Sequence, residues 1–119
     1  MATITLYHNP QCSKSRQALL LLQNSGLEIR VIYYLKTPLS LSELRDLSEK
    51  LNLPPRDFIR STEAIYKTLN LDHESLTSDD LLDAISKYPR LMERPIAVCG
   101  THAIIGRPPE NVLAFLDKL

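Results

Sequence analysis

The first third of the chain alternates short apolar runs with one helical pattern. Residues Thr3–His8 combine β-branched and aromatic side chains and predict a strand, which an Asn-Pro pair ends. Ser13–Ser25 predicts a helix, and Glu28–Leu35, rich in Val, Ile and Tyr, predicts a second strand. Because the connections are short, we expect a βαβ unit whose two strands run parallel.

The middle of the chain has helical periodicity. Ser40–Glu43 has the sequence of a capping box and precedes leucines at helical spacing. Pro54–Arg60 and Thr62–Leu69 predict shorter helices. Thr77–Tyr88 predicts another helix, with Thr77 as its N-cap and acidic residues in its first turn, where the helix dipole favours them.

The last third returns to strands. Arg94–Gly100 and Thr101–Gly106 predict a β-hairpin, and Pro108–Leu119 predicts an amphipathic helix. The element order is therefore βαβ, a helical segment, then ββα. It predicts an α/β chain of thioredoxin-like fold with a mixed four-stranded sheet: one domain, 1–119, with a helical insertion at about 40–90.

Composition narrows the function classes. In 119 residues, 14 basic and 14 acidic side chains balance, which argues against a general nucleic-acid or membrane-surface binder. The two cysteines cannot form a disulfide framework, and the longest apolar run is far shorter than the roughly 20 residues that cross a bilayer. The opening residues lack the pattern of a signal peptide. We therefore expect a cytoplasmic protein with no membrane or nucleic-acid partner.

Cys12 is the main candidate for chemistry. It stands at the expected N-cap of the first helix, with Lys14 and Arg16 just beyond it. A helix N-terminus and nearby positive charge both lower the pKa of a thiol, and the thiolate is the nucleophile. The alternative is a small apolar side chain packed at a strand end. The position favours the reactive interpretation.

Neighbouring side chains are candidates for tuning this thiol. The hydroxyls of Ser13 and Ser15 are possible donors to a sulfur anion, and His8 lies close enough to add charge or polarity. Ser15 also occupies the place of the second cysteine in a Cys-x-x-Cys motif, so Cys12 cannot form that disulfide. Cys99 lies in an apolar strand and is expected to be a buried core residue. A second thiol would then come from another molecule.

Three arginines form the second candidate group. Arg94 and Arg107 flank the predicted hairpin, so they are expected near the same end of it, while Arg60 ends a predicted helix in the insertion. Guanidinium groups donate paired hydrogen bonds that suit a tetrahedral oxyanion. The alternative is three solvated surface side chains, because sequence spacing alone does not bring them to Cys12.

Other candidates carry little signal. Cys99 and His102 are separated by two residues, but no second pair accompanies them, so we expect no metal site. His73 lies in a polar connection and is expected to be exposed.

The chain resembles the glutaredoxin-linked arsenate reductases, which have a thioredoxin-like fold. The similar stretches are "YHNPQCSKSR", "YYLKTPLS", "RPI" and "GRPPE", and the resemblance covers essentially the whole chain. It implies that Cys12 is the catalytic cysteine and that the other site residues have the following roles: Arg60, Arg94 and Arg107 bind the oxyanion, His8 and Ser15 tune the cysteine, and Pro95 is the cis-proline.

The resemblance also implies the reaction. We expect arsenate to be reduced to arsenite by the Cys12 thiolate, with glutathione as co-substrate, glutaredoxin as partner, and no bound cofactor or metal. One alternative is a glutathione-dependent reductase of protein mixed disulfides. Another is a non-enzymatic regulator that binds RNA polymerase, as in a sibling branch that often carries Cys-x-x-Cys, a motif this chain lacks.

Overall fold

The computed structural model describes residues 3–119, so the first two residues of the predicted domain lie outside it. The chain divides into two compact units. One, here called the sheet unit, runs to Thr37 and resumes as Arg94–Leu119; the other, the helical unit, is Pro38–Glu93. The residues of the predicted insertion, about 40–90, all belong to the helical unit.

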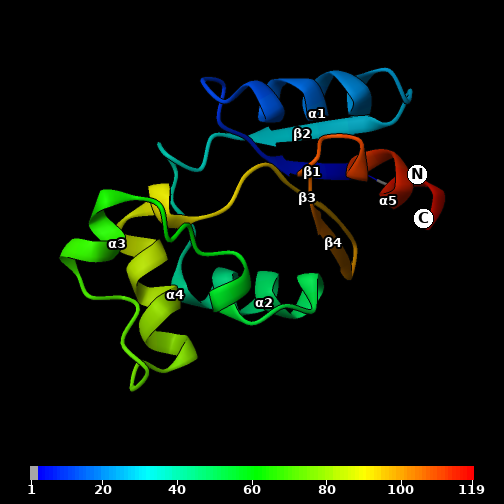
Figure 1. Ribbon diagram of the computed structural model, residues 1–119. Coiled ribbons are helices and arrows are strands. Elements are labelled where there is room, and N and C mark those ends of the chain that lie inside the picture. Colours follow the sequence, from blue (N-terminus) through cyan, green and yellow to red (C-terminus); the bar gives the residue numbers. More distant parts are fainter. Residues whose placement is uncertain (1–2) are drawn as a thin grey trace. The chain divides into compact units, whose positions relative to one another are not determined.

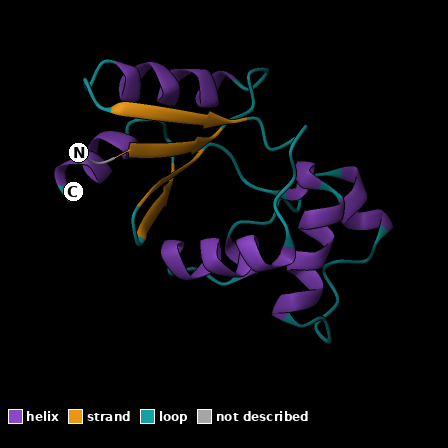
Figure 2. Cartoon of the chain, turned by 180° about the vertical axis from the view of Figure 1, so that it is seen from behind, coloured by secondary structure: helices purple, strands orange, loops and turns teal. Residues whose placement is uncertain are grey.

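The sheet unit contains the predicted βαβ and ββα halves (Figures 1 and 2). Its elements follow one another as β1 (Thr3–Tyr7), α1 (Ser13–Gln23), β2 (Glu28–Ile32), β3 (Ile96–Cys99), β4 (His102–Ile105) and α5 (Asn111–Asp117). The four strands form one sheet in the order β2-β1-β3-β4, with β1 parallel to β2 and the other neighbours antiparallel. The predicted mixed four-stranded sheet is confirmed.

The core of the sheet unit lies between the sheet and two helices. Alternate residues of β1, Ile4 and Leu6, are fully buried together with Ala18 and Leu22 of α1. Val112 and Phe115 of α5 join the same cluster. Because strand side chains alternate between faces, both helices pack against one face of the sheet.

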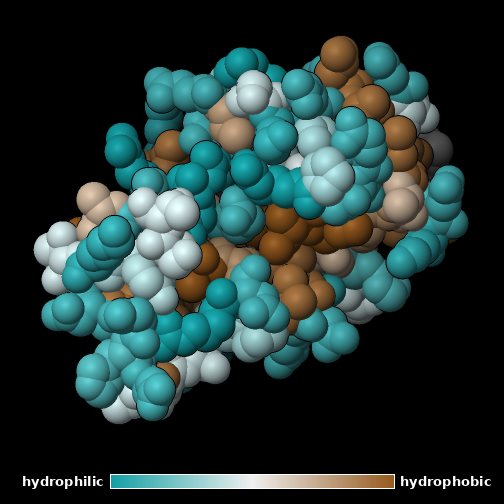
Figure 3. Space-filling view, viewed as in Figure 1, coloured by the Kyte–Doolittle hydropathy of each residue, from teal (hydrophilic) through white to brown (hydrophobic). Residues whose placement is uncertain are grey.

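The surface over α1 changes along the helix. Its first residues are polar and its second half is leucine-rich. In the space-filling view (Figure 3), the area over this helix is hydrophilic at its N-terminal end and gains apolar side chains toward its C-terminal end. The end that carries Cys12 is therefore the polar end of the helix.

The helical unit is built from short helices. They are α2 (Leu41–Leu51), the 3-10 turn η1 (Pro55–Asp57), α3 (Ala64–Thr68), α4 (Ser78–Lys87) and the 3-10 turn η2 (Pro89–Leu91). Both predicted caps are present: Ser40 with Glu43, and Thr77 with Asp80, form reciprocal capping boxes. Buried leucines of α2 and α4 face one another in its core.

Several predicted boundaries were too long. The second strand ends at Ile32 rather than Leu35, because Tyr33–Lys36 folds into a turn in which the N–H groups of Lys36 and Thr37 both bond to the Tyr33 carbonyl. The helix predicted over Pro54–Arg60 is only one 3-10 turn.

Over residues 3–119, no helix has the length and apolar character to span a bilayer.

Candidate functional site

Cys12 caps the N-terminus of α1, as the sequence predicts. Its backbone is extended, with φ −94° and ψ 121°, and its carbonyl accepts the first helical hydrogen bond from the N–H of Arg16 at 3.0 Å. The N–H of Cys12 bonds back to the carbonyl of Asn9 at 3.0 Å, which closes the turn between β1 and α1. The strand and the turn therefore present the thiol at the open end of the helix.

The surroundings of Cys12 favour the thiolate. Burial by itself raises the pKa of this thiol, but the Ser15 backbone N–H, the charge of Arg94, the Lys14 backbone N–H and a hydrogen bond from the Arg94 side chain together bring its pKa below the ordinary value. The lowered pKa therefore comes from backbone donors and one guanidinium. The side-chain charges of Lys14 and Arg16, which the sequence suggested, are not among the causes.

The Ser15 hydroxyl serves a different partner from the one expected. Its side chain is fully buried, and Oγ lies 2.6 Å from Nδ1 of His8 and accepts a hydrogen bond from the Asn9 N–H at 3.1 Å. A hydroxyl has one proton and two lone pairs, so besides accepting from Asn9 it can donate to His8 Nδ1 or accept from it, according to the tautomer of the ring. Ser15 thus assists the sulfur through its backbone and holds His8 through its side chain.

The surroundings of His8 disfavour the protonated form of its ring. Burial lowers its pKa and the positive charge of Arg16 lowers it further, while the Arg16 guanidinium itself donates to the Pro10 carbonyl at 2.9 Å. The His8 ring packs edge-on against Tyr33, with ring centroids 5.9 Å apart. Of the two contributions expected of His8, charge or polarity, the lowered pKa favours polarity.

Arg94 and Arg107 leave the same end of the β3–β4 hairpin, as predicted. Ile96 pairs with Ile105, and just beyond this pair the N–H of Gly106 donates to the Pro95 carbonyl at 2.8 Å. The Arg94–Pro95 and Arg107–Pro108 peptide bonds are both cis. Asn111, the first residue of α5, donates its side-chain amide to the Arg107 carbonyl at 3.1 Å and so fixes this loop.

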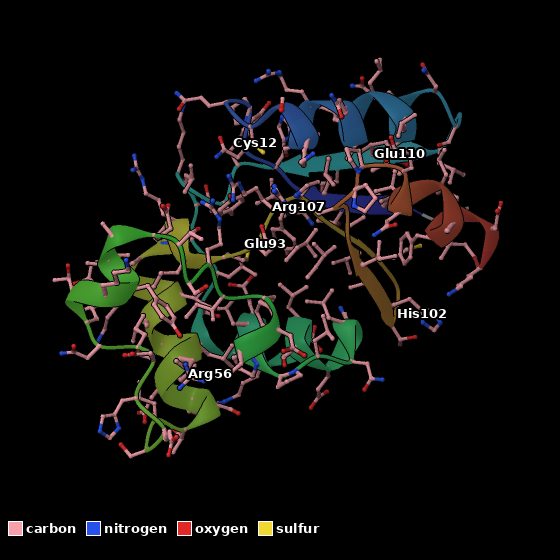
Figure 4. The ribbon with its side chains drawn as sticks, in the orientation of Figure 1. Cys12, Arg56, Glu93, His102, Arg107 and Glu110 are labelled. Carbon is pink, nitrogen blue, oxygen red and sulfur yellow. The ribbon has the colours of Figure 1, made fainter. Side chains whose placement is uncertain are left out.

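Arg94 is the cation that reaches the sulfur. Both its Nε and its Nη1 atoms are buried, and its charge and hydrogen bond act on the Cys12 thiol. Figure 4 labels Cys12 and Arg107, which belong to the loops before α1 and after β4 of the sheet unit. A cation beside the thiolate can stabilise both the nucleophile and an incoming oxyanion.

Arg60 belongs to the helical unit, where two carboxylates surround it. Its Nη1 lies 3.2 Å from Oε1 of Glu63, and its Nε lies 3.9 Å from Oε1 of Glu93; the three side chains are only 21–28% exposed. The backbone around it is also tied, since the Arg60 N–H donates to the Leu91 carbonyl at 2.7 Å. An oxyanion that used Arg60 would compete with Glu63 and Glu93. Its role in binding stays a prediction.

The remaining candidates behave as ordinary residues. Cys99 is half-buried against the core, less enclosed than expected, because it ends β3 next to the hairpin turn. His102 and His73 are exposed, and His73 Nδ1 bonds to Ser75. Within residues 3–119, no three His, Cys, Asp or Glu side chains gather as a metal site.

Sequence reasoning missed the contacts made between elements. It named Ser15 and His8 but not their mutual bond, and it gave no sign of Tyr33 against His8 or of the carboxylates around Arg60. It also passed over Arg56, whose guanidinium donates to the Tyr66 hydroxyl and to the Leu71 and His73 carbonyls, so that it pins the connection between α3 and α4 (Figure 4). The polar sequence between α3 and α4 gave no indication that an arginine side chain holds this connection.

Comparisons with known proteins find similar chains over nearly the whole length of this one. The chain is 47% identical over 117 residues to an arsenate reductase of Neisseria meningitidis, a match that covers 98% of this chain and all of the relative. It is 48% identical over 114 residues to the uncharacterized protein YfgD of Escherichia coli K12, covering 95% and 96% of the two chains. The structure of an arsenate reductase from Vibrio cholerae superposes with a TM-score of 0.92 at 46% identity and covers 95% of this chain and 97% of that one.

The fold comparison confirms the predicted thioredoxin-like α/β class. The model of the ArsC family matches residues 7–115, a span that includes the Cys12 loop, the helical unit and the cis-proline hairpin. This chain therefore belongs to the ArsC family.

Proposed function

We propose that this protein reduces arsenate to arsenite, with glutathione as co-substrate and glutaredoxin as the partner that regenerates the enzyme. The observation that carries the proposal is Cys12 at a helix N-terminus, with its pKa lowered by backbone N–H groups and by Arg94. Family membership and the names of close relatives support arsenate as the oxyanion.

In the proposed first step, the Cys12 thiolate attacks arsenic(V), a sulfur–arsenic bond forms, and one arsenate oxygen leaves as water. Arg94 and Arg107 neutralise the oxyanion charge, and Arg60 is the third arginine of the set that the resemblance implies. His8 and Ser15 hold the loop that presents the thiolate. No bound cofactor or metal takes part.

In the next step, the thiolate of glutathione attacks the Cys12 sulfur. A disulfide forms between glutathione and Cys12, and the electron pair of the sulfur–arsenic bond stays on arsenic, which leaves as arsenite. A second thiol, on glutaredoxin, then attacks the glutathione sulfur and releases the Cys12 thiolate. Overall, two thiols become one disulfide, arsenic gains two electrons, and one water forms. This dependence on reduced glutathione suits a cytoplasmic protein.

The test is arsenate-dependent oxidation of NADPH in the presence of glutathione, glutathione reductase and glutaredoxin. We expect Cys12→Ser to abolish the rate, and Cys99→Ala, the matched control at the other cysteine, to keep it. A rate that Cys12→Ser leaves unchanged would contradict the mechanism. Greater activity on a glutathionylated protein than on arsenate would instead favour the mixed-disulfide reductase. Co-purification with RNA polymerase would favour the non-enzymatic regulator.

A further inference from the structure

A hollow beside the end of β2 has no part in the site described above. It has a volume of about 350 Å³ and is lined by residues of the strand and of the turn that follows it: Arg30, Val31, Ile32, Tyr33, Lys36 and Thr37. Three of these residues, Tyr33, Lys36 and Thr37, belong to a turn in which the N–H groups of Lys36 and Thr37 both bond to the Tyr33 carbonyl. All of these residues belong to the sheet unit.

The hollow adjoins the loop that carries Cys12. The parallel register sets Tyr7 beside Ile32, and the next residue, His8, donates its N–H to the Ile32 carbonyl at 2.9 Å. The ring of His8 then meets the ring of Tyr33, which lines the hollow. In Figures 1 and 2, the chain leaves β1 and β2 at the same end of the sheet, so the hollow and the nucleophile share that end.

The lining residues favour an anionic occupant. Arg30 and Lys36 are both exposed cations, the hydroxyls of Tyr33 and Thr37 add hydrogen-bonding groups, and no carboxylate lines the hollow. Two cations around a small concave surface match a ligand with two separated carboxylates.

The backbone adds a second kind of recognition. Among the described strands, β2 pairs only with β1 and forms an edge of the sheet. The peptide groups on its outer side can therefore bond to an extended peptide laid along it. An extended tripeptide is about 10 Å long, so it can lie along the last few residues of one strand.

We propose that this hollow binds glutathione, with its two terminal carboxylates on Arg30 and Lys36, its peptide groups along the edge of β2, and its thiol directed toward Cys12. This proposal rests on the proposed function, because the glutathione bound in the hollow is the one whose thiol attacks the Cys12 sulfur. It adds no chemical step. A small peptide fits better than a protein, since a stable protein interface needs about 800 Å² on each partner.

The direct test measures binding without turnover. S-methylglutathione, which cannot form a disulfide, is titrated into the ¹⁵N-labelled protein without arsenate, and the backbone amide signals are followed at millimolar concentrations. We expect the largest shifts at residues 30–37, and an increase in dissociation constant of about tenfold or more when Arg30→Gln and Lys36→Gln are combined, because two charge-assisted contacts are lost. Lys118→Gln, which removes an exposed cation at the end of α5, is the matched control and should not change binding.

Steady-state kinetics supply an independent readout. In the coupled assay, the double variant should raise the KM for glutathione while leaving the KM for arsenate near that of the wild type. Absence of S-methylglutathione binding, or binding that the double variant does not weaken, would overturn the proposal even if arsenate reduction by Cys12 were confirmed. Weakened glutaredoxin affinity in the double variant, with no S-methylglutathione binding, would also overturn it and would identify this edge as a protein-docking surface.

Discussion

The Ser15 hydroxyl offers the sharpest test of how the Cys12 loop is held. Ser15 is fully buried. Its Oγ lies 2.6 Å from His8 Nδ1 and accepts a hydrogen bond from the Asn9 N–H at 3.1 Å. Ser15→Ala removes both bonds while leaving the helix backbone in place. A buried polar group that loses its partner costs about 1–3 kcal/mol, and since His8 is buried and Asn9 is half-buried, we expect a loss of about 2 kcal/mol in the free energy of unfolding.

The assay is urea unfolding followed by circular dichroism, with Ser13→Ala as the matched control. Ser13 is an exposed residue of the same helical turn, so both substitutions gain the same helix propensity and the difference between them isolates the buried hydroxyl. With a typical urea dependence of 1–3 kcal/mol per molar, the Ser15→Ala midpoint should fall by about 1 M relative to Ser13→Ala. Equal midpoints for the two variants would refute the hydrogen-bond assignment.

Two further predictions concern the nucleophile and the hairpin. Because the Cys12 pKa is lowered and only the thiolate reacts, the rate of alkylation by iodoacetamide should stay high at pH values where a free thiol is protonated. Arg94→Gln should raise the pH at which the alkylation rate is half-maximal. Lys14→Gln should leave that pH unchanged, since Lys14 acts through its backbone N–H. Equal midpoints for these two variants would contradict the assigned role of Arg94. Gly106→Ala should lower the free energy of unfolding, measured in urea, by about 1–3 kcal/mol, because the added Cβ would lie 2.9 Å from Pro95 Cγ and 3.3 Å from Val112 Cγ1. A loss below about 0.5 kcal/mol would contradict this prediction and show that the buried Pro95 ring moves aside easily.

Local patterns were sufficient for most elements of the fold. The capping boxes at Ser40 and Thr77, the βαβ order and the hairpin around Gly100 depend on neighbouring residues, so their signals are present in short stretches of sequence. The second strand was predicted to be too long because Tyr33 and Tyr34 favour strands by propensity, whereas the hydrogen bonds of the turn decide its end at Ile32.

For the candidate site, the sequence by itself determined that Cys12 would stand at the N-terminus of α1 and that Arg94 and Arg107 would meet at one end of a hairpin. Each of these placements follows from residues near in the chain. Only the tertiary structure decided which groups act on the thiol. Arg94, more than eighty residues away, supplies the charge, while Arg16 and the Ser15 hydroxyl act on His8 instead. The physical reason is that a pKa depends on distance, burial and donor direction in space, and strand pairing sets all three across the whole chain.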